Sequence, residues 1–98
     1  MQISYKNKKI EKICTDTSYA RKKHGLDMAI KIHERVNEIK ASDNVENMIK
    51  YGIGRCHELK GDRSGDYAVD LVQPYRLTFS VERNEVMIAL IKEIIDYH

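Results

Sequence analysis

The chain of 98 residues is expected to form a single domain, residues 1–98, with one modest core. A chain this short buries only roughly 60 to 65% of its unfolded surface. Its composition, 42% hydrophobic and 33% charged with one Pro and five Gly, excludes a disordered or low-complexity protein. The first nine residues lack the apolar region of a signal peptide, and no apolar run approaches the roughly 20 residues that span a bilayer.

The two cysteines, Cys14 and Cys56, form neither a metal-binding motif nor a disulfide framework. We expect both in the core of a cytoplasmic, reduced protein that has no membrane partner. The formal net charge of +2 is too small to indicate a nucleic-acid partner by itself.

The charge is nevertheless unevenly distributed. Residues 1–40 contain ten Lys or Arg against five Asp or Glu, whereas residues 41–98 contain seven against ten. A basic N-terminal part suits a phosphate backbone. Its candidates for contact with nucleic acid are Lys8, Lys9 and Lys12. The alternative is an ordinary solvated helix surface.

The N-terminal part predicts one strand followed by helices. Residues 2–5 are short and alternating, as in a strand, and residues 6–16 place apolar side chains at helical spacing. Residues 17–25 predict a short helix that Thr17 or Ser18 caps. The clearest helix covers residues 26–41.

The helix over residues 26–41 has two distinct sides. Its apolar stripe consists of Ala29, Ile32, Val36 and Ile39, and we expect Lys31, Glu34, Arg35 and Glu38 on the solvated side. A connector follows to residue 54, in which Ser42 or Asp43 caps a single helical turn.

From residue 55 the apolar period changes from 3.6 to 2, which indicates strands. The expected strands cover residues 55–60, 66–72, 75–82 and 85–98, with turns between them. The last segment has some helical character, but its many β-branched residues favour a strand. The sequence therefore predicts an α+β fold, with two to three helices on one face of an antiparallel sheet of four to five strands. The other face is left partly open.

Arg76 is expected on that other face. In "YRLTFSV" the apolar residues alternate with polar ones, so Arg76 projects away from the helices. An arginine in the middle of a sheet needs an anion, either a carboxylate or a phosphate that it holds with two N–H groups. A cross-strand ion pair with Asp70 or Asp66 explains it equally well.

A second basic group lies within "RCHELKGDR". Arg55, His57, Lys60 and Arg63 fall within nine residues, and His57 shares a parity with Arg55. A lone histidine in a strand is usually structural. Together with several cations on one face, it matches the needs of metal-free phosphodiester cleavage, in which two groups move protons and cations stabilise the charge on the phosphate oxygens.

The closing "DYH" adds Asp96, Tyr97 and His98 to these candidates. An imidazole has an unperturbed pKa of roughly 6.5, and a tyrosine ring can stack on a base. The alternative is a polar tail. The histidines and cysteines do not have the spacing of metal ligands. The sequence also contains no H-E-x-x-H motif, no G-x-S-x-G motif and no phosphate-binding glycine loop, so we expect no metal and no cofactor.

The chain resembles the HigB-type toxins of the RelE/ParE toxin–antitoxin superfamily. The resemblance rests on "YKNKKIEKIC", "ARKKHGLDMAIKIHERVNEIKAS", "HELKGDRSGDYAVDL", "PYRLTF" and "DYH" in that order, from residue 5 to residue 98. It implies a curved sheet covered by helices. It also implies metal-independent cleavage of messenger RNA on the 70S ribosome, by attack of a 2′-hydroxyl that leaves a 2′,3′-cyclic phosphate.

The resemblance also implies roles and partners. His57 or His98 would be the general base and the other the general acid, and Arg76 would hold the phosphate. Tyr97 would orient or stack on the nucleotide, and Asp96 would hold a histidine or the ribose. Further RNA contacts would come from Lys60, Arg55 and Arg63. The partner would be a HigA-like helix-turn-helix antitoxin, through which alone the toxin meets operator DNA.

Two other readings stay open. A ParE-like toxin would inhibit DNA gyrase through protein contacts without catalysis, but it would not need two imidazoles around a cation. A degenerate relative would only bind its antitoxin.

Overall fold

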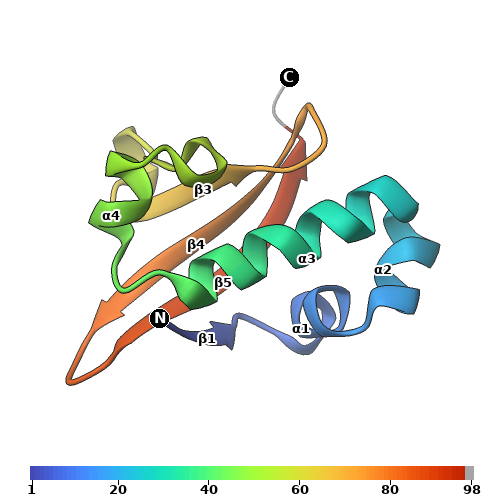
Figure 1. Cartoon of the computed structure of the whole chain (residues 1–98), viewed down its shortest axis with the longest axis horizontal. Coiled ribbons are helices and arrows are strands. Elements are labelled where there is room, and N and C mark those ends of the chain that lie inside the picture. The colour runs from blue at the N-terminus through green and yellow to red at the C-terminus, as the bar shows by residue number, and fades with distance from the viewer. Residues whose placement is uncertain (97–98) are drawn as a thin grey trace.

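The computed structural model describes residues 1–96, which form a five-stranded sheet with helices on one face (Figure 1). The strands are β1 (Gln2–Tyr5), β2 (His57–Glu58), β3 (Asp66–Asp70), β4 (Tyr75–Arg83) and β5 (Met87–Asp96), in the order β1-β5-β4-β3-β2. The predicted α+β class is confirmed. The antiparallel expectation fails only for β1, which pairs with β5 in parallel. The long connection between these strands, which contains the helices and β2 to β4, permits this parallel pairing.

Four helices precede β2 in the described part of the chain: α1 (Lys8–Thr15), α2 (Thr17–His24), α3 (Leu26–Ala41) and α4 (Val45–Lys50). The segment expected to be a single turn is thus the six-residue α4, one helix more than predicted. The predicted caps are wrong by one or two positions. Asp16 accepts from the backbone N–H of Tyr19 at 3.0 Å, and Asn44 accepts from that of Asn47 at 2.8 Å. Both have the side-chain oxygen that an N-cap needs.

The core lies between α3 and the sheet. The apolar stripe of α3 is buried as predicted, with Met28 added to it. It belongs to one core cluster with Leu77 and Phe79 of β4 and Ile91 of β5, all 0% exposed. Cys14 and Cys56 are buried in the same cluster and free, as expected. No helix among the described residues is long and apolar enough to cross a membrane.

The segment predicted as a strand over residues 55–60 is mostly not a strand. Residues Ile53–Arg55 form a 3₁₀ turn, only His57–Glu58 pair with β3, and Gly61–Arg63 form a second 3₁₀ turn. The backbone explains this difference, because Gly52, Gly54 and Arg55 all have positive φ. Extended strands do not use that conformation.

The hairpin of β4 and β5 is the longest pairing in the sheet and contains one irregularity. Thr78 pairs with Glu93 and Phe79 with Ile91, so Lys92 is an extra residue in β5. Such a bulge changes the direction in which side chains leave the strand. In this sheet it lies beside the charged residues described next.

Candidate functional site

The register of the strands places His57 and Arg76 on the same face of the sheet, the face away from α3. His57 pairs with Ala68, Ala68 with Thr78, and Asp70 with Arg76. Their Cα atoms are therefore roughly 12 Å apart, two strands across and two residues along. Side chains that lean toward each other from these positions can contact one phosphodiester from two sides.

Arg76 lies beside a carboxylate. Its Nε lies 3.5 Å from Oδ1 of Asp70, and the Nε of Arg55 lies 3.4 Å from Oδ2 of the same residue. The Asp70 side chain is only 9% exposed, whereas Arg55 is 80% exposed and Arg76 is 27% exposed. The cross-strand ion pair that the sequence left open therefore exists. It also brings two guanidinium groups together, which we call the Arg55–Asp70–Arg76 cluster.

His57 is attached to the same cluster through the backbone. Its Nδ1 lies 3.0 Å from the carbonyl oxygen of Arg55. A carbonyl only accepts, so Nδ1 carries the proton in this hydrogen bond, and Nε2 of the neutral ring is left with its lone pair. The half-buried imidazole thus has the tautomer that a general base needs.

The position of Arg55 has a backbone cause. Arg55 has φ 55°, in the left-handed region that side chains other than glycine disfavour by about 1 to 2 kcal/mol. The alternation argument for placing it beside His57 was therefore wrong, because Arg55 is not in a strand. The tight turn nevertheless puts its guanidinium on Asp70.

A second group of charges occupies the centre of the outer face. Asp66 accepts from Nζ of Lys92 at 2.8 Å and from Nε of Arg63 at 3.1 Å, and Arg63 also donates to Glu93 at 2.7 Å. Burial raises the pKa of Asp66, but the hydrogen bonds from Lys92 and Arg63 outweigh it and hold the pKa below its usual value. The bulge in β5 lets the consecutive Lys92 and Glu93 both join this group.

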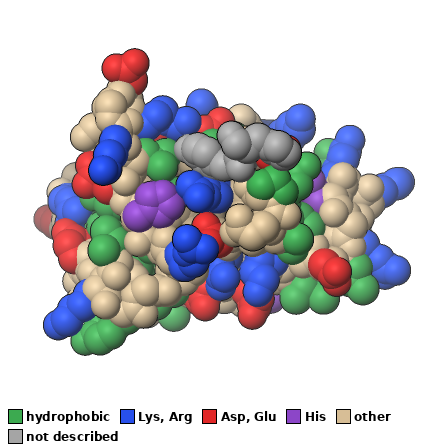
Figure 2. Space-filling model, turned by 90° about the horizontal axis from the view of Figure 1, so that it is seen from above, with side chains coloured by type: hydrophobic (Ala, Val, Ile, Leu, Met, Phe, Trp, Pro, Cys, Tyr) green, Lys and Arg blue, Asp and Glu red, His purple; other side chains and the backbone are tan. Residues whose placement is uncertain are grey.

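The outer face is therefore less open than predicted. Ala68 and Thr78 at its centre are fully buried, and Asp66 and Asp70 are nearly so. The reason is that long cationic side chains lie on the two aspartates. Figure 2, seen from above, shows Lys and Arg side chains, acidic side chains and a histidine close together on the surface. This surface is charged and mixed in sign.

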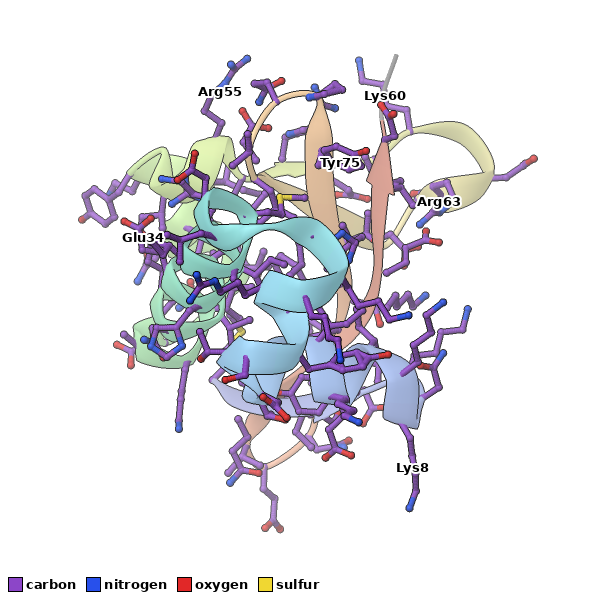
Figure 3. The ribbon with its side chains drawn as sticks, turned by 90° about the vertical axis from the view of Figure 1, so that its right-hand side faces the viewer. Lys8, Glu34, Arg55, Lys60, Arg63 and Tyr75 are labelled. Carbon is purple, nitrogen blue, oxygen red and sulfur yellow. The ribbon has the colours of Figure 1, made fainter. Side chains whose placement is uncertain are left out.

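The remaining candidates lie in different places. Asp96 ends β5 opposite Tyr75, next to the Arg76 pairing. Tyr97 and His98 lie outside the described residues. Arg55 and Lys60 lie at the same end of the molecule as Tyr75, and Lys8 lies at the opposite end (Figure 3).

The three basic residues of α1 have different neighbours. Lys8, Lys9 and Lys12 are all exposed. Lys9 lines a hollow of about 230 Å³ together with Lys92 and Glu93, so it neighbours the second charged group. Lys12 stacks on Tyr19, with its Nζ 4.4 Å from the ring centre.

Sequence reasoning missed Arg35. It was expected on the solvated side of α3, yet its side chain is only 16% exposed. Its Nε donates to the backbone oxygen of Asp70 at 2.6 Å. Asp66, Lys92 and Glu93 were also not among the candidates, although a run of charges in an apolar strand was a visible signal. In residues 1–96 no group of three His, Cys, Asp or Glu residues is arranged to hold a metal ion.

Comparison with known proteins identifies the fold. No protein-family model and no curated protein matches the chain. The chain is similar over its whole length to a YoeB/ParE toxin from Agrobacterium tumefaciens, with 15% identity, 100% of that chain covered and a TM-score of 0.61. It is also similar over its whole length to the YoeB–YefM complex from Staphylococcus aureus, with 23% identity, 97% covered and a TM-score of 0.60. The YoeB dimer from the same organism gives 21%, 97% and 0.55, also over the whole of this chain. At these identities the likeness establishes one thing, that the chain has the fold of YoeB/ParE toxins.

Proposed function

We propose that this protein is the toxin of a toxin–antitoxin pair and an endoribonuclease that cleaves messenger RNA on the ribosome without a metal ion. The observation that carries this proposal is the outer face of the sheet. A histidine whose Nε2 can accept a proton shares that face with two arginines 3.4 and 3.5 Å from one carboxylate. The part of the proposal that makes the protein a toxin is supported by the similarity of its fold to YoeB/ParE toxins.

The chemistry follows from the positions of these groups. Nε2 of His57 takes the proton of a ribose 2′-hydroxyl, and the 2′-oxygen attacks the adjacent phosphorus. The P–O5′ bond breaks, a 2′,3′-cyclic phosphate forms, and an acid protonates the departing 5′-oxygen. His98 is the proposed acid. Arg76 and Arg55 stabilise the charge that collects on the non-bridging oxygens, a contribution worth about 10²- to 10³-fold in comparable sites.

The proposed partners are an antitoxin and the ribosome. One of the similar structures is a YoeB–YefM complex, which favours a dedicated protein partner for this chain as well. A HigA-like helix-turn-helix antitoxin is the partner that the sequence resemblance implies, and operator DNA would be reached only through it. Lys60, Arg63 and the lysines of α1 are proposed RNA contacts.

The test is cleavage of a defined messenger on translating ribosomes by the purified protein. His57→Gln should lower the cleavage rate by about 10²- to 10⁴-fold, because a general base is lost. His33→Gln is the matched control, since His33 is an exposed histidine whose ring contacts Asn37 on α3. Equal cleavage by the two variants would remove His57 from the mechanism.

The competing function is inhibition of DNA gyrase, since one similar structure is named a YoeB/ParE toxin. Primer extension on messenger RNA after induction separates the two. Discrete codon-linked breaks support cleavage, whereas an SOS response with intact messages supports gyrase. Absence of toxicity would support the inactive relative.

A further inference from the structure

We infer that Arg35 of α3 is a positioning residue, which sets the geometry of Arg55 and Arg76 through the backbone of Asp70. The inference rests on the proposed function only in assigning a phosphate to those two arginines. Arg35 contacts the backbone of Asp70 and the turn at Gly54, so its effect on the two arginines passes through these two segments.

The contact of Arg35 with the sheet is short and directional. Its Nε donates to the carbonyl oxygen of Asp70 at 2.6 Å, and its Nη1 donates to Oε1 of Glu38 at 2.8 Å. Glu38, one turn further along α3, therefore fixes the plane of the guanidinium. The hydrogen bond to Asp70 joins residues 35 positions apart and ties the helix layer to the last residue of β3.

The turn before β2 is built around the same side chain. A Cβ on Gly54 would lie 2.9 Å from both Cδ and Nε of Arg35 and 3.2 Å from Cβ of Val69. Gly54 also has φ +59°, which itself favours glycine. The turn that presents Arg55 thus passes directly over Arg35. One side chain contacts both segments that carry the Arg55–Asp70–Arg76 cluster.

The contacts that the two arginines make with the Asp70 carboxylate are long. Charge-assisted hydrogen bonds between nitrogen and oxygen are typically about 2.7 to 2.9 Å long. The two arginines lie 3.4 and 3.5 Å from the Asp70 carboxylate. Such contacts attract but do not fix an orientation, so the position of the carboxylate has to come from the backbone that carries it. Arg35 holds that backbone.

The experiment compares Arg35→Met with Arg35→Lys. Methionine keeps an apolar stem of similar length but has no donor, whereas lysine keeps the stem, the charge and a donor for the Asp70 carbonyl. Lys31→Met is the matched control, because Lys31 pairs with Glu34 at 2.9 Å on the same helix, away from the sheet. All variants are first checked for cooperative unfolding.

The primary readout is independent of activity. The Nε–H signals of Arg55 and Arg76 are followed by NMR while inorganic phosphate is added. Arg35→Met should move both signals and weaken phosphate binding by about tenfold, the equivalent of one hydrogen bond to a charged group. Arg35→Lys should restore most of the affinity, and Lys31→Met should change neither quantity.

The second readout is cleavage on ribosomes. Arg35→Met should lower kcat by roughly 10²-fold with little change in KM, as when a reacting group is displaced by about 1 Å. The inference is overturned if Arg35→Met leaves the two arginine signals in place, or if methionine and lysine behave alike. A wild-type protein that cleaves no RNA would instead refute the proposed function and leave the NMR result to decide the role of Arg35.

Discussion

Replacing Asp70 with Asn should destabilise the protein and at the same time strengthen its binding to RNA. The Asp70 carboxylate is 9% exposed and lies 3.4 and 3.5 Å from the Nε atoms of Arg55 and Arg76. The amide keeps the shape and an acceptor but removes the charge. Loss of the ion pair between this carboxylate and the partly exposed Arg76 costs about 1 kcal/mol. For a domain of this size, the midpoint of thermal unfolding should fall by roughly 4 to 8 °C.

The gain in RNA affinity follows from the same geometry. A phosphate held by these two arginines would lie on their far side, at about 7 Å from the Asp70 carboxylate. With an effective dielectric constant of about 40, between protein and water, the repulsion between the two anions is about 1.2 kcal/mol. Its removal should lower Kd for a single-stranded RNA by roughly five- to tenfold.

The assays are thermal unfolding by circular dichroism and fluorescence anisotropy with a labelled RNA at fixed salt. Glu85→Gln is the matched control, because it removes one charge from the exposed turn between β4 and β5. If both variants change the RNA affinity equally, the effect is one of net charge. If Asp70→Asn unfolds at the wild-type temperature, the carboxylate does not hold the arginines.

Three further outcomes test the fold. Phe79→Ala should cost about 3 to 5 kcal/mol in urea denaturation, because Phe79 is 0% exposed and stacks on Tyr67; a loss below 1 kcal/mol would contradict the packing. Because the pKa of Asp66 is lowered in the folded protein, its contribution to stability is complete above the pKa of an unfolded aspartate and is lost as the pH falls through the lower folded value. The unfolding midpoints of wild type and Asp66→Asn should therefore differ most near neutral pH and converge only in acid below the folded pKa. Burial raises the pKa of Cys14 and Cys56 to about 12, so both thiols should react with a thiol reagent only after unfolding.

Alternation was enough to predict the main strands and the face on which Arg76 lies. Leu77 and Phe79 are buried against α3, and Arg76 projects from the other face, because a strand has a strict period of two. The stripe of α3 was predictable for the same kind of reason. In a regular helix or strand, burial repeats with a fixed period, so a few apolar residues predict which other side chains are buried.

The candidate site was predictable only in part, because much of it depends on irregular backbone. The positive φ of Arg55 and the extra residue at Lys92 follow no period. Arg35 occupies a position on α3 that a helical pattern assigns to solvent, yet the loop at Gly54 folds over it. Long-range contacts of this kind are decided by tertiary packing, which the local sequence does not encode.

The parallel pairing of β1 with β5 has a consequence for how the protein is made. Gln2 pairs with Ile88, so the first strand can join the sheet only after a partner 86 positions later has been synthesised. Such non-local pairing slows folding, because the chain between the two strands loses conformational entropy before the contact between them stabilises the fold. Until β5 has left the ribosome, β1 has no strand to pair with, and β4, which carries Arg76, lacks its neighbour on that side.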